Sequence, residues 1–321
     1  VLVLVGILGV NPHIMGKLNL GIDFSGGRNY IIRFAEPVNT EEVNTALDNV
    51  FMEAMAASNS DETFAVNVIT IGDANQVRVS TNYRINDNSE TLDDEIEALL
   101  YEGCKQFLPE NVTLKEFTST DINPEIGIMQ SQKVGPAIAD DITQSAVWAV
   151  LAALLGIFLY VLLRFRNFSF SVGALAGLAH NTLIVLGAYA LLWKVMPFSM
   201  EIDQSFIAAI LTVIGYSIND TVVIFDRVRE YTGLYPKRAR KQNINDALNQ
   251  TLSRTFSTSM STLVVLIAIF CFGGETIRGF VFALIIGVVV GTYSSLCVAT
   301  PLAYDIQEAL DRRKAKKALK K

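Results

Sequence analysis

The chain has 321 residues, of which 51% are hydrophobic and 18% are charged, and its formal net charge is −6. The charge is divided unevenly, since residues 11–141 hold 22 acidic and 8 basic residues, whereas the rest of the chain holds 10 acidic and 18 basic residues. An acidic block beside an apolar, basic remainder excludes a simple cytosolic enzyme. It also argues against a nucleic-acid binder, because the basic residues follow the ends of apolar runs.

Apolar runs of membrane-spanning length dominate the second half of the chain. A helix needs roughly 20 apolar residues to cross a hydrocarbon core of about 30 Å. Five runs meet this requirement: 142–163, 168–193, 204–225, 252–272 and 278–303. A sixth run, Val1–Val10, has half the necessary length and begins without Met. We interpret it as the end of a first transmembrane helix whose beginning is missing, with a signal-peptide core as the alternative.

The connections between these spans differ in positive charge. Lys and Arg residues gather between the second and third spans, between the fourth and fifth spans, and in the tail 304–321, whereas the alternate connections hold few. Positive charge marks the cytoplasmic side of a membrane protein, so the tail is expected to be cytoplasmic and residues 11–141 periplasmic. A basic tail that binds nucleic acid is the competing interpretation.

Strand and helix patterns alternate within the predicted periplasmic domain. The strand patterns cover Tyr30–Phe34, Phe64–Ile71, Gln76–Asn82 and Val112–Phe117. The helix patterns begin at Asn39 or Thr40, ending near Ala57, and at Ser89, ending near Leu108. Their polar first residues are typical helix N-caps. The order β-α-β-β-α-β predicts a ferredoxin-like fold.

A glycine-rich run, Gly21-Ile-Asp-Phe-Ser-Gly-Gly27, follows the first apolar run. It lacks the Gly-Lys-Ser/Thr ending of a phosphate-binding loop, so a nucleotide site is the less favoured interpretation. The glycines, Gly26 among them, permit a tight turn where the chain leaves the membrane. In such a turn Asp23 and Ser25 are expected to bond the local backbone.

Asp220 carries the clearest functional signal in the sequence. It lies inside the fourth span, where burying a carboxylate costs roughly 2.5–3.5 kcal/mol on insertion scales. A carboxylate at this cost is expected to have either a charged partner or a functional role. At helical spacing, Asp220 belongs to a polar stripe. The other members of the stripe are Thr212, Tyr216, Ser217 and Thr221, with Asn219 beside them.

A second polar stripe in the fifth span faces the first. It consists of Thr251, Arg254, Thr255, Thr258, Ser259 and Thr262. Because the fourth and fifth spans run antiparallel, Arg254 reaches the depth of Asp220. The two residues form either a structural ion pair, with hydroxyl groups joining the helices, or a proton path in which Arg254 controls the protonation of Asp220. We favour the proton path.

Small residues in two further spans indicate close helix packing. In the sixth span they recur at every fourth position: Gly279, Ala283, Gly287, Gly291, Ser295 and Ala299. The third span carries Gly173 and Gly177, followed by His180. A lone His inside a span is typically a hydrogen bonder between helices, and no second His or Cys stands at ligand spacing, so we expect no metal site.

Several motifs together resemble those of one known family. They are Gly21–Gly27, Val134-Gly135-Pro136 at the start of the second span, the run Gly215-Tyr-Ser-Ile-Asn-Asp-Thr-Val-Val-Ile-Phe-Asp-Arg-Val-Arg-Glu230, and Phe272-Gly-Gly274. This combination is similar to that of the SecD/SecF family of protein-export membrane proteins, over essentially the whole chain. The resemblance implies an α-helical, RND-transporter-like membrane protein with six spans and one large external loop.

The resemblance further implies an accessory subunit of the Sec protein translocase that is not an enzyme. Such a subunit lies in the bacterial inner membrane and uses the proton-motive force to promote polypeptide export, with protons as the coupling ion and no other cofactor. The implied partners are SecD, the SecYEG channel and the translocating polypeptide. The missing start fits the C-terminal half of a fused SecD–SecF chain.

Carried over by position, Asp220 and Arg254 correspond to the proton-coupling pair of the family. Asn181 stands where many members have Asp, so a second buried carboxylate is absent and proton carriage depends more heavily on Asp220. A proton-coupled exporter of a small molecule or lipid is the alternative function. A purely structural stabiliser of the channel is a third.

Overall fold

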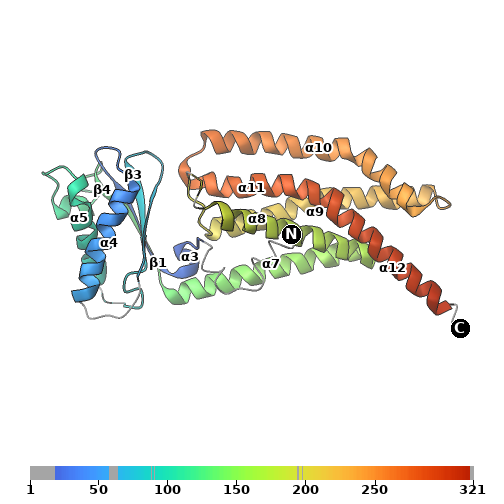
Figure 1. Ribbon diagram of the computed structural model, residues 1–321, viewed down its shortest axis with the longest axis horizontal. Coiled ribbons are helices and arrows are strands. Elements are labelled where there is room, and N and C mark those ends of the chain that lie inside the picture. The colour runs from blue at the N-terminus through green and yellow to red at the C-terminus, as the bar shows by residue number, and fades with distance from the viewer. Residues whose placement is uncertain are drawn as a thin grey trace.

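The computed structural model describes residues 19–57, 64–87, 89, 91–193, 195–196 and 198–318. These residues form a small α/β domain and a bundle of long helices, arranged end to end (Figure 1). The predicted end of a first transmembrane helix, Val1–Val10, lies outside the described residues.

Five helical segments of the described ranges are long and apolar enough to cross a membrane. They are α7 (Pro136–Phe165), α8 (Phe168–Leu192), α9 (Gln204–Leu234), α10 (Arg240–Phe272), and a last segment formed by α11 (Glu275–Ser294), the π-helical turn η2 (Ser295–Ala299) and α12 (Thr300–Ala318). The five complete spans predicted from hydropathy are therefore confirmed. Four of the five segments continue beyond the predicted span, since polar residues extend the helices outside the hydrocarbon core.

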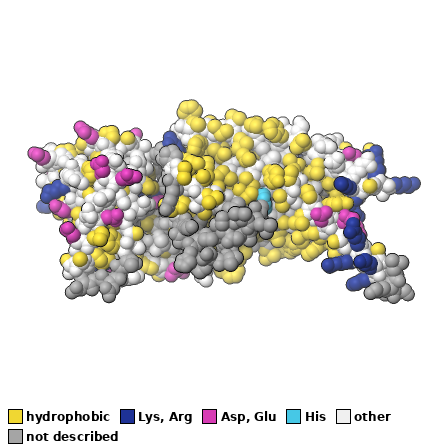
Figure 2. Space-filling model, viewed as in Figure 1, with side chains coloured by type: hydrophobic (Ala, Val, Ile, Leu, Met, Phe, Trp, Pro, Cys, Tyr) yellow, Lys and Arg dark blue, Asp and Glu magenta, His cyan; other side chains and the backbone are white. Residues whose placement is uncertain are grey.

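The helices differ in how much of their apolar surface is covered by the chain itself. Helices α8 and α9 and the last segment are extensively buried, whereas α7 and α10 leave most of their apolar side chains exposed. Hydrophobic side chains predominate on the part of the bundle surface that described residues form in this view, while Lys and Arg gather at the end farthest from the α/β domain (Figure 2). The exposed faces of α7 and α10 are available to lipid or to another protein.

The α/β domain is built on a four-stranded antiparallel sheet with the order β2-β3-β1-β4. The strands are β1 (Gly27–Arg33), β2 (Val66–Thr70), β3 (Gln76–Thr81) and β4 (Gly127–Val134). Helix α4 (Thr40–Ala57) follows β1, and helix α5 (Thr91–Cys104) follows β3 and continues into the 3₁₀ turn η1 (Lys105–Phe107). Alternate residues of the strands face these two helices, which leaves the opposite face of the sheet polar.

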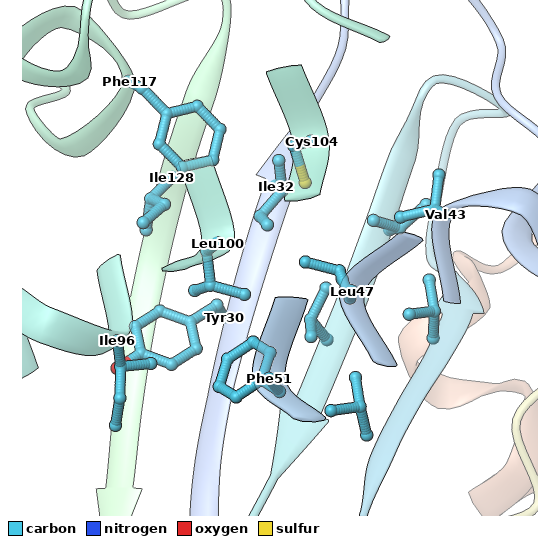
Figure 3. Packing of buried hydrophobic residues seen from close by; sticks show 14 of the residues in the cluster. Tyr30, Ile32, Val43, Leu47, Phe51, Ile96, Leu100, Cys104, Phe117 and Ile128 are labelled. Atoms are coloured by element: carbon cyan, nitrogen blue, oxygen red, sulfur yellow. The ribbon is translucent and has the colours of Figure 1, made fainter. Parts of the chain in front are cut away.

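The core of this domain lies between the sheet and its two helices (Figure 3). Leu47 and Phe51 of α4 and Leu100 of α5 are fully buried against Tyr30 and Ile32 of β1. Both helices bury apolar residues at four-residue spacing, so one face of each helix covers the sheet.

The predicted strand at Val112–Phe117 is wrong. Residues Leu114–Thr118 form the short helix α6, because Glu116 Oε2 accepts hydrogen bonds from the backbone amide (2.7 Å) and the hydroxyl (2.9 Å) of Thr113. This Thr-x-x-Glu pattern is a helix-start signal that the alternation of apolar residues concealed. The fourth strand is β4, an edge strand with a polar, exposed centre, which alternation alone does not reveal.

The glycine-rich run forms the single helical turn α3 (Ile22–Ser25) and then a sharp change of direction. Gly26 has φ = 70° and Gly27 has φ = 151°, conformations that favour glycine. The Ser25 hydroxyl donates to Gly21 O (3.0 Å), as expected for a local contact. The expectation of a local contact is wrong for Asp23, whose Oδ2 accepts a hydrogen bond from the backbone amide of Gln204 at the start of α9 (3.2 Å).

Candidate functional site

Polar side chains meet inside the helical bundle where α8, α9, α10 and the last segment come together. We call this group the polar layer. It consists of His180, Asn181, Ser217, Asp220, Thr221, Ser259, Thr292, Ser294 and Ser295. Polar groups at membrane depth are costly unless they bond one another, so their hydrogen bonds determine how these helices fit together.

Asn181 lies at the centre of the polar layer and is fully buried. In the amide orientation that satisfies its neighbours, it accepts a hydrogen bond from Ser217 Oγ (2.7 Å) and donates one to Ser294 Oγ (2.6 Å). His180 Nδ1 lies 2.6 Å from the same Ser294 oxygen. His180 is therefore a hydrogen bonder between helices, as predicted. Within the described ranges, His, Cys, Asp and Glu form no cluster suited to a metal ion.

The π-helical turn η2 continues the polar layer toward α9. Ser295 Oγ lies 2.9 Å from Thr221 Oγ1 and within 3.3 Å of Ser217 O. The Ser295 carbonyl in this turn also accepts a hydrogen bond from Thr300 Oγ1 (2.9 Å). Such π-helical turns recur at functional sites of other proteins, where they shift side chains out of regular helical register.

The small residues of the last segment and of α8 permit these short contacts. A Cβ atom added to Gly291 would lie 3.2 Å from Ser217 Cβ, and one added to Gly287 would lie 2.1 Å from Val213 Cγ2. A Cβ atom on Gly173 would lie 2.5 Å from Ala299 O. The predicted close packing therefore occurs between α9 and α11, and between α8 and η2.

Asp220 lies at the edge of the polar layer that faces α10. The residue is 5% exposed, and its Oδ2 has no hydrogen-bond partner among the described residues. The Ser259 hydroxyl lies on the neighbouring helix and pairs with Thr292 Oγ1 (2.6 Å), and the Arg254 guanidinium acts on the Asp220 carboxylate electrostatically. Arg254 itself is on an exposed part of α10 and forms no ion pair with Asp220 in the described structure. The helices thus hold a buried carboxylate with one unpartnered oxygen. The cation that acts on it, the Arg254 guanidinium, belongs to a long, exposed side chain.

The other residues of the predicted stripes divide between the two sides of their helices. Ser217, Thr221 and Thr255 are buried, and Tyr216 Oη donates to Thr262 Oγ1 (3.3 Å) between α9 and α10. The remaining members, Thr212, Asn219, Thr258 and Arg254, are exposed. Sequence reasoning missed Thr292 and Ser294 as polar-layer residues, because neither lies in a polar stripe at helical spacing within the sixth span.

The glycine and proline residues of the motifs have different roles. Gly135 is the N-cap of α7 and Pro136 its first residue, a position that suits proline because no intrahelical partner is lost. The backbone amide of Gly21 donates to Ile202 O (3.0 Å), which joins the root of the α/β domain to the segment before α9. Nothing lies within 4 Å of a Cβ atom on Gly215, so the structure gives no packing reason for that glycine.

Replacement of Asn181 by Leu is expected to destabilise the bundle by about 1–3 kcal/mol, because Ser217 and Ser294 would each lose a buried partner. The measurement is the midpoint of thermal unfolding of the detergent-purified protein. Thr182→Val is the matched control, since Thr182 Oγ1 bonds only the carbonyl of Leu178 in its own helix. Equal midpoints for the two variants would contradict a structural role for the Asn181 contacts.

Five long apolar helices around a buried carboxylate, joined to a small α/β domain, define a multi-pass membrane protein with a polar layer at membrane depth. Residues 114–309 match the family model for the C-terminal part of the protein-export membrane proteins SecD and SecF, and residues 16–38 match the SecD/SecF GG motif. The chain belongs to the SecD/SecF family.

Similar proteins include translocase subunits from two organisms. The protein translocase subunit SecF of Rhodothermus marinus is 39% identical over 90% of this chain and 84% of its own length. The corresponding subunit of Thermodesulfovibrio yellowstonii is 36% identical over 94% of this chain and 88% of its own length. These relatives are subunits of a translocase, and the family is not one of enzymes.

The fold is similar to that of a crystal structure of SecDF, a translocon-associated membrane protein from Thermus thermophilus. The TM-score is 0.73 at 30% sequence identity, over 96% of this chain. The match covers 37% of the SecDF chain, so this chain spans little more than a third of that protein. The similarity extends to both the helical bundle and the α/β domain.

Proposed function

We propose that this chain is an accessory subunit of the Sec protein translocase and uses the proton-motive force to promote polypeptide export. The relatives that cover most of its length are translocase subunits, which supports the first half of the proposal. One observation carries the second half: the buried carboxylate of Asp220 has an unpartnered oxygen and is under the electrostatic influence of the Arg254 guanidinium on the neighbouring helix.

The arrangement suits a site that gains and loses a proton. A charged Asp220 is stabilised by the nearby Arg254, whereas a neutral Asp220 is favoured when the guanidinium moves away from the buried site. Each state therefore prefers a different position of α10 relative to α9. One elementary charge crossing the membrane potential releases about 2.3 kcal/mol per 100 mV, enough to bias such a movement in every cycle.

The proposed location is the bacterial inner membrane, with residues 11–141 in the periplasm and the tail 304–321 in the cytoplasm. Lys and Arg gather at the bundle end that carries α12, and acidic side chains are prominent on the α/β domain (Figure 2). This polarity agrees with the positive-inside rule. The domain boundaries that follow are 1–10 for the first span, 11–141, 142–303 for spans two to six, and 304–321.

We assign the α/β domain to the ferredoxin-like class. Its order β-α-β-β-α-β and its sheet order β2-β3-β1-β4 support this assignment, since each helix connects two strands that have a third strand between them. The proposed partners are SecD, the SecYEG channel and the translocating polypeptide. Protons are the proposed coupling ion, with no further cofactor.

Loss of this chain from its host is expected to slow the export of secreted precursors severalfold and to leave the efflux of small molecules unchanged. The measurement is a pulse-chase assay of precursor processing, with and without a protonophore, beside efflux of a fluorescent dye. The control is the same strain complemented with the intact chain. Normal precursor processing with reduced dye efflux would favour a small-molecule exporter instead.

A further inference from the structure

The polar face of the sheet meets the segment that precedes α9. Arg78 on β3 points away from the core of its domain, because its neighbours Val77 and Val79 fill the core. Its Nη1 lies 3.0 Å from Oε2 of Glu201, 123 residues further along the chain. The two side chains are only 18% and 9% exposed, so this ion pair is largely withdrawn from water.

The root of the domain is also joined to this segment by hydrogen bonds. Ile202 bonds the backbone of Asn19 (2.8 Å) and of Gly21 (3.0 Å), and Asp23 bonds the amide of Gln204 (3.2 Å). These contacts remain in place if the sheet tilts about its root, because all of their domain-side partners precede Gly26. The Arg78–Glu201 ion pair, in contrast, must break.

Cavities lie on both sides of the ion pair. One of about 270 Å³ is bounded by the sheet residues Asn29, Ile31, Gln130 and Gln132 and by the root of the domain. A smaller one, of about 80 Å³, is bounded by Tyr189, Ser199 and Phe206 on the membrane side. Space on both sides means that the ion pair holds the sheet in a position that close packing does not enforce.

Negative charges gather around Glu201, so breaking the ion pair has a high electrostatic cost. Burial raises the pKa of Glu201 and the Arg78 guanidinium counteracts the rise. Burial also raises the pKa of Asp203, and the negative charge of Asp23 adds to this effect. The Arg78 guanidinium thus acts on two buried carboxylates, Glu201 and Asp203, so its departure leaves buried negative charge without a partner.

Glu201 is also directly connected to the proposed proton site. Asp203 caps α9 by accepting a hydrogen bond from the amide of Phe206 (2.8 Å), so Glu201 lies immediately before the helix. Asp220 lies on the same helix, about 24 Å from its first residue at ~1.5 Å per residue. A shift or rotation of α9 at Asp220 therefore moves Glu201 relative to the sheet.

We propose that the Arg78–Glu201 ion pair is a latch that holds the external domain against the membrane helices and opens once in each proton cycle. The inference rests on the proposed function, since the movement of α9 that opens the latch is driven at Asp220. In this arrangement Arg78 and Glu201 are positioning residues. They fix the position of the external domain and take no part in proton transfer.

The test is to lock the latch in the full chain, assembled with its partners in membrane vesicles. Cys271→Ser and Cys297→Ser first remove the two exposed native thiols, whereas burial raises the pKa of the Cys104 thiol to about 12 and keeps it unreactive. Arg78→Cys and Glu201→Cys are then joined by a short bismaleimide. Proton-driven export of a secreted precursor is measured before and after the reaction.

Cross-linking is expected to reduce proton-driven export about tenfold or more, whereas a monofunctional maleimide on the same two cysteines should leave it near its value before the reaction. The matched control joins Glu102→Cys to Lys105→Cys, an exposed ion pair (3.5 Å) within one helical end of the domain. Unchanged export in the cross-linked protein would overturn the latch.

Charge reversal gives an independent measurement. Arg78→Glu and Glu201→Arg should each lower proton-driven export about tenfold, because each leaves like charges in a poorly hydrated contact. The double variant restores the attraction and should recover most of the export, and failure to recover would count against the latch. If Asp220→Asn leaves export unchanged, the proposed function fails; if Asp220→Asn abolishes it while the cross-link is silent, only the latch fails.

Discussion

Replacement of Asp220 by Asn is expected to abolish the part of export that depends on the proton-motive force. The amide has nearly the same shape as the carboxylate and stays polar, so the protein should still assemble and accumulate in the membrane. It cannot, however, exchange a proton or respond to Arg254. The loss can reach a factor of about fifty per 100 mV, since about 2.3 kcal/mol per charge is no longer available.

The measurement compares export into membrane vesicles with and without an imposed proton gradient. Asp226→Asn is the matched control, because Asp226 lies on the same helix but forms exposed ion pairs with Arg164 (2.9 Å) and Arg229 (3.0 Å). The control should keep its response to the gradient. Asp220→Asn vesicles that respond as strongly as the control would remove Asp220 from the mechanism.

The membrane helices could be predicted from sequence because their signal is local. Each span is a continuous apolar run, and a carboxylate within such a run stands out without any knowledge of its neighbours. The polar stripe on α10 identified its buried face only in part, since Thr251, Thr255 and Ser259 are buried whereas Arg254 and Thr258 are exposed. These features depend on the residues of one helix at a time.

Features that depend on several segments were missed, because sequence patterns report on one helix or strand at a time. Asn181, Ser217 and Ser294 come from three helices, and only their packing shows that they form one hydrogen-bonded group. Arg78 and Glu201 are 123 residues apart and belong to different parts of the molecule. The fourth strand was misplaced for a local reason. The capping contacts of Thr113 and Glu116 stabilise a short helix at a position where the alternation of apolar residues predicts a strand.

Replacement of Gly287 by Ala should destabilise the bundle by about 2–3 kcal/mol through overpacking. The added Cβ atom would lie 2.1 Å from Val213 Cγ2 and 2.7 Å from Val213 Cγ1, so α9 and α11 must separate. That separation would also pull Ser217 away from Gly291 and loosen the polar layer beside Asp220. We expect both a lower unfolding midpoint and weaker proton-driven export.

Two further variants make the cause of this loss testable. Gly156→Ala on α7 adds the same atom where nothing lies within 4 Å, so it should leave stability and export unchanged. Val213→Ala combined with Gly287→Ala removes the two nearest clashing methyl groups and leaves only Val213 Cβ, at 2.9 Å, so it should recover part of the stability and the export. A double variant that stays as impaired as Gly287→Ala would show that the α9–α11 contact does not hold the polar layer in place. Recovery of stability without recovery of export would instead mean that the proton site depends on the exact position of α9, beyond the stability of the bundle.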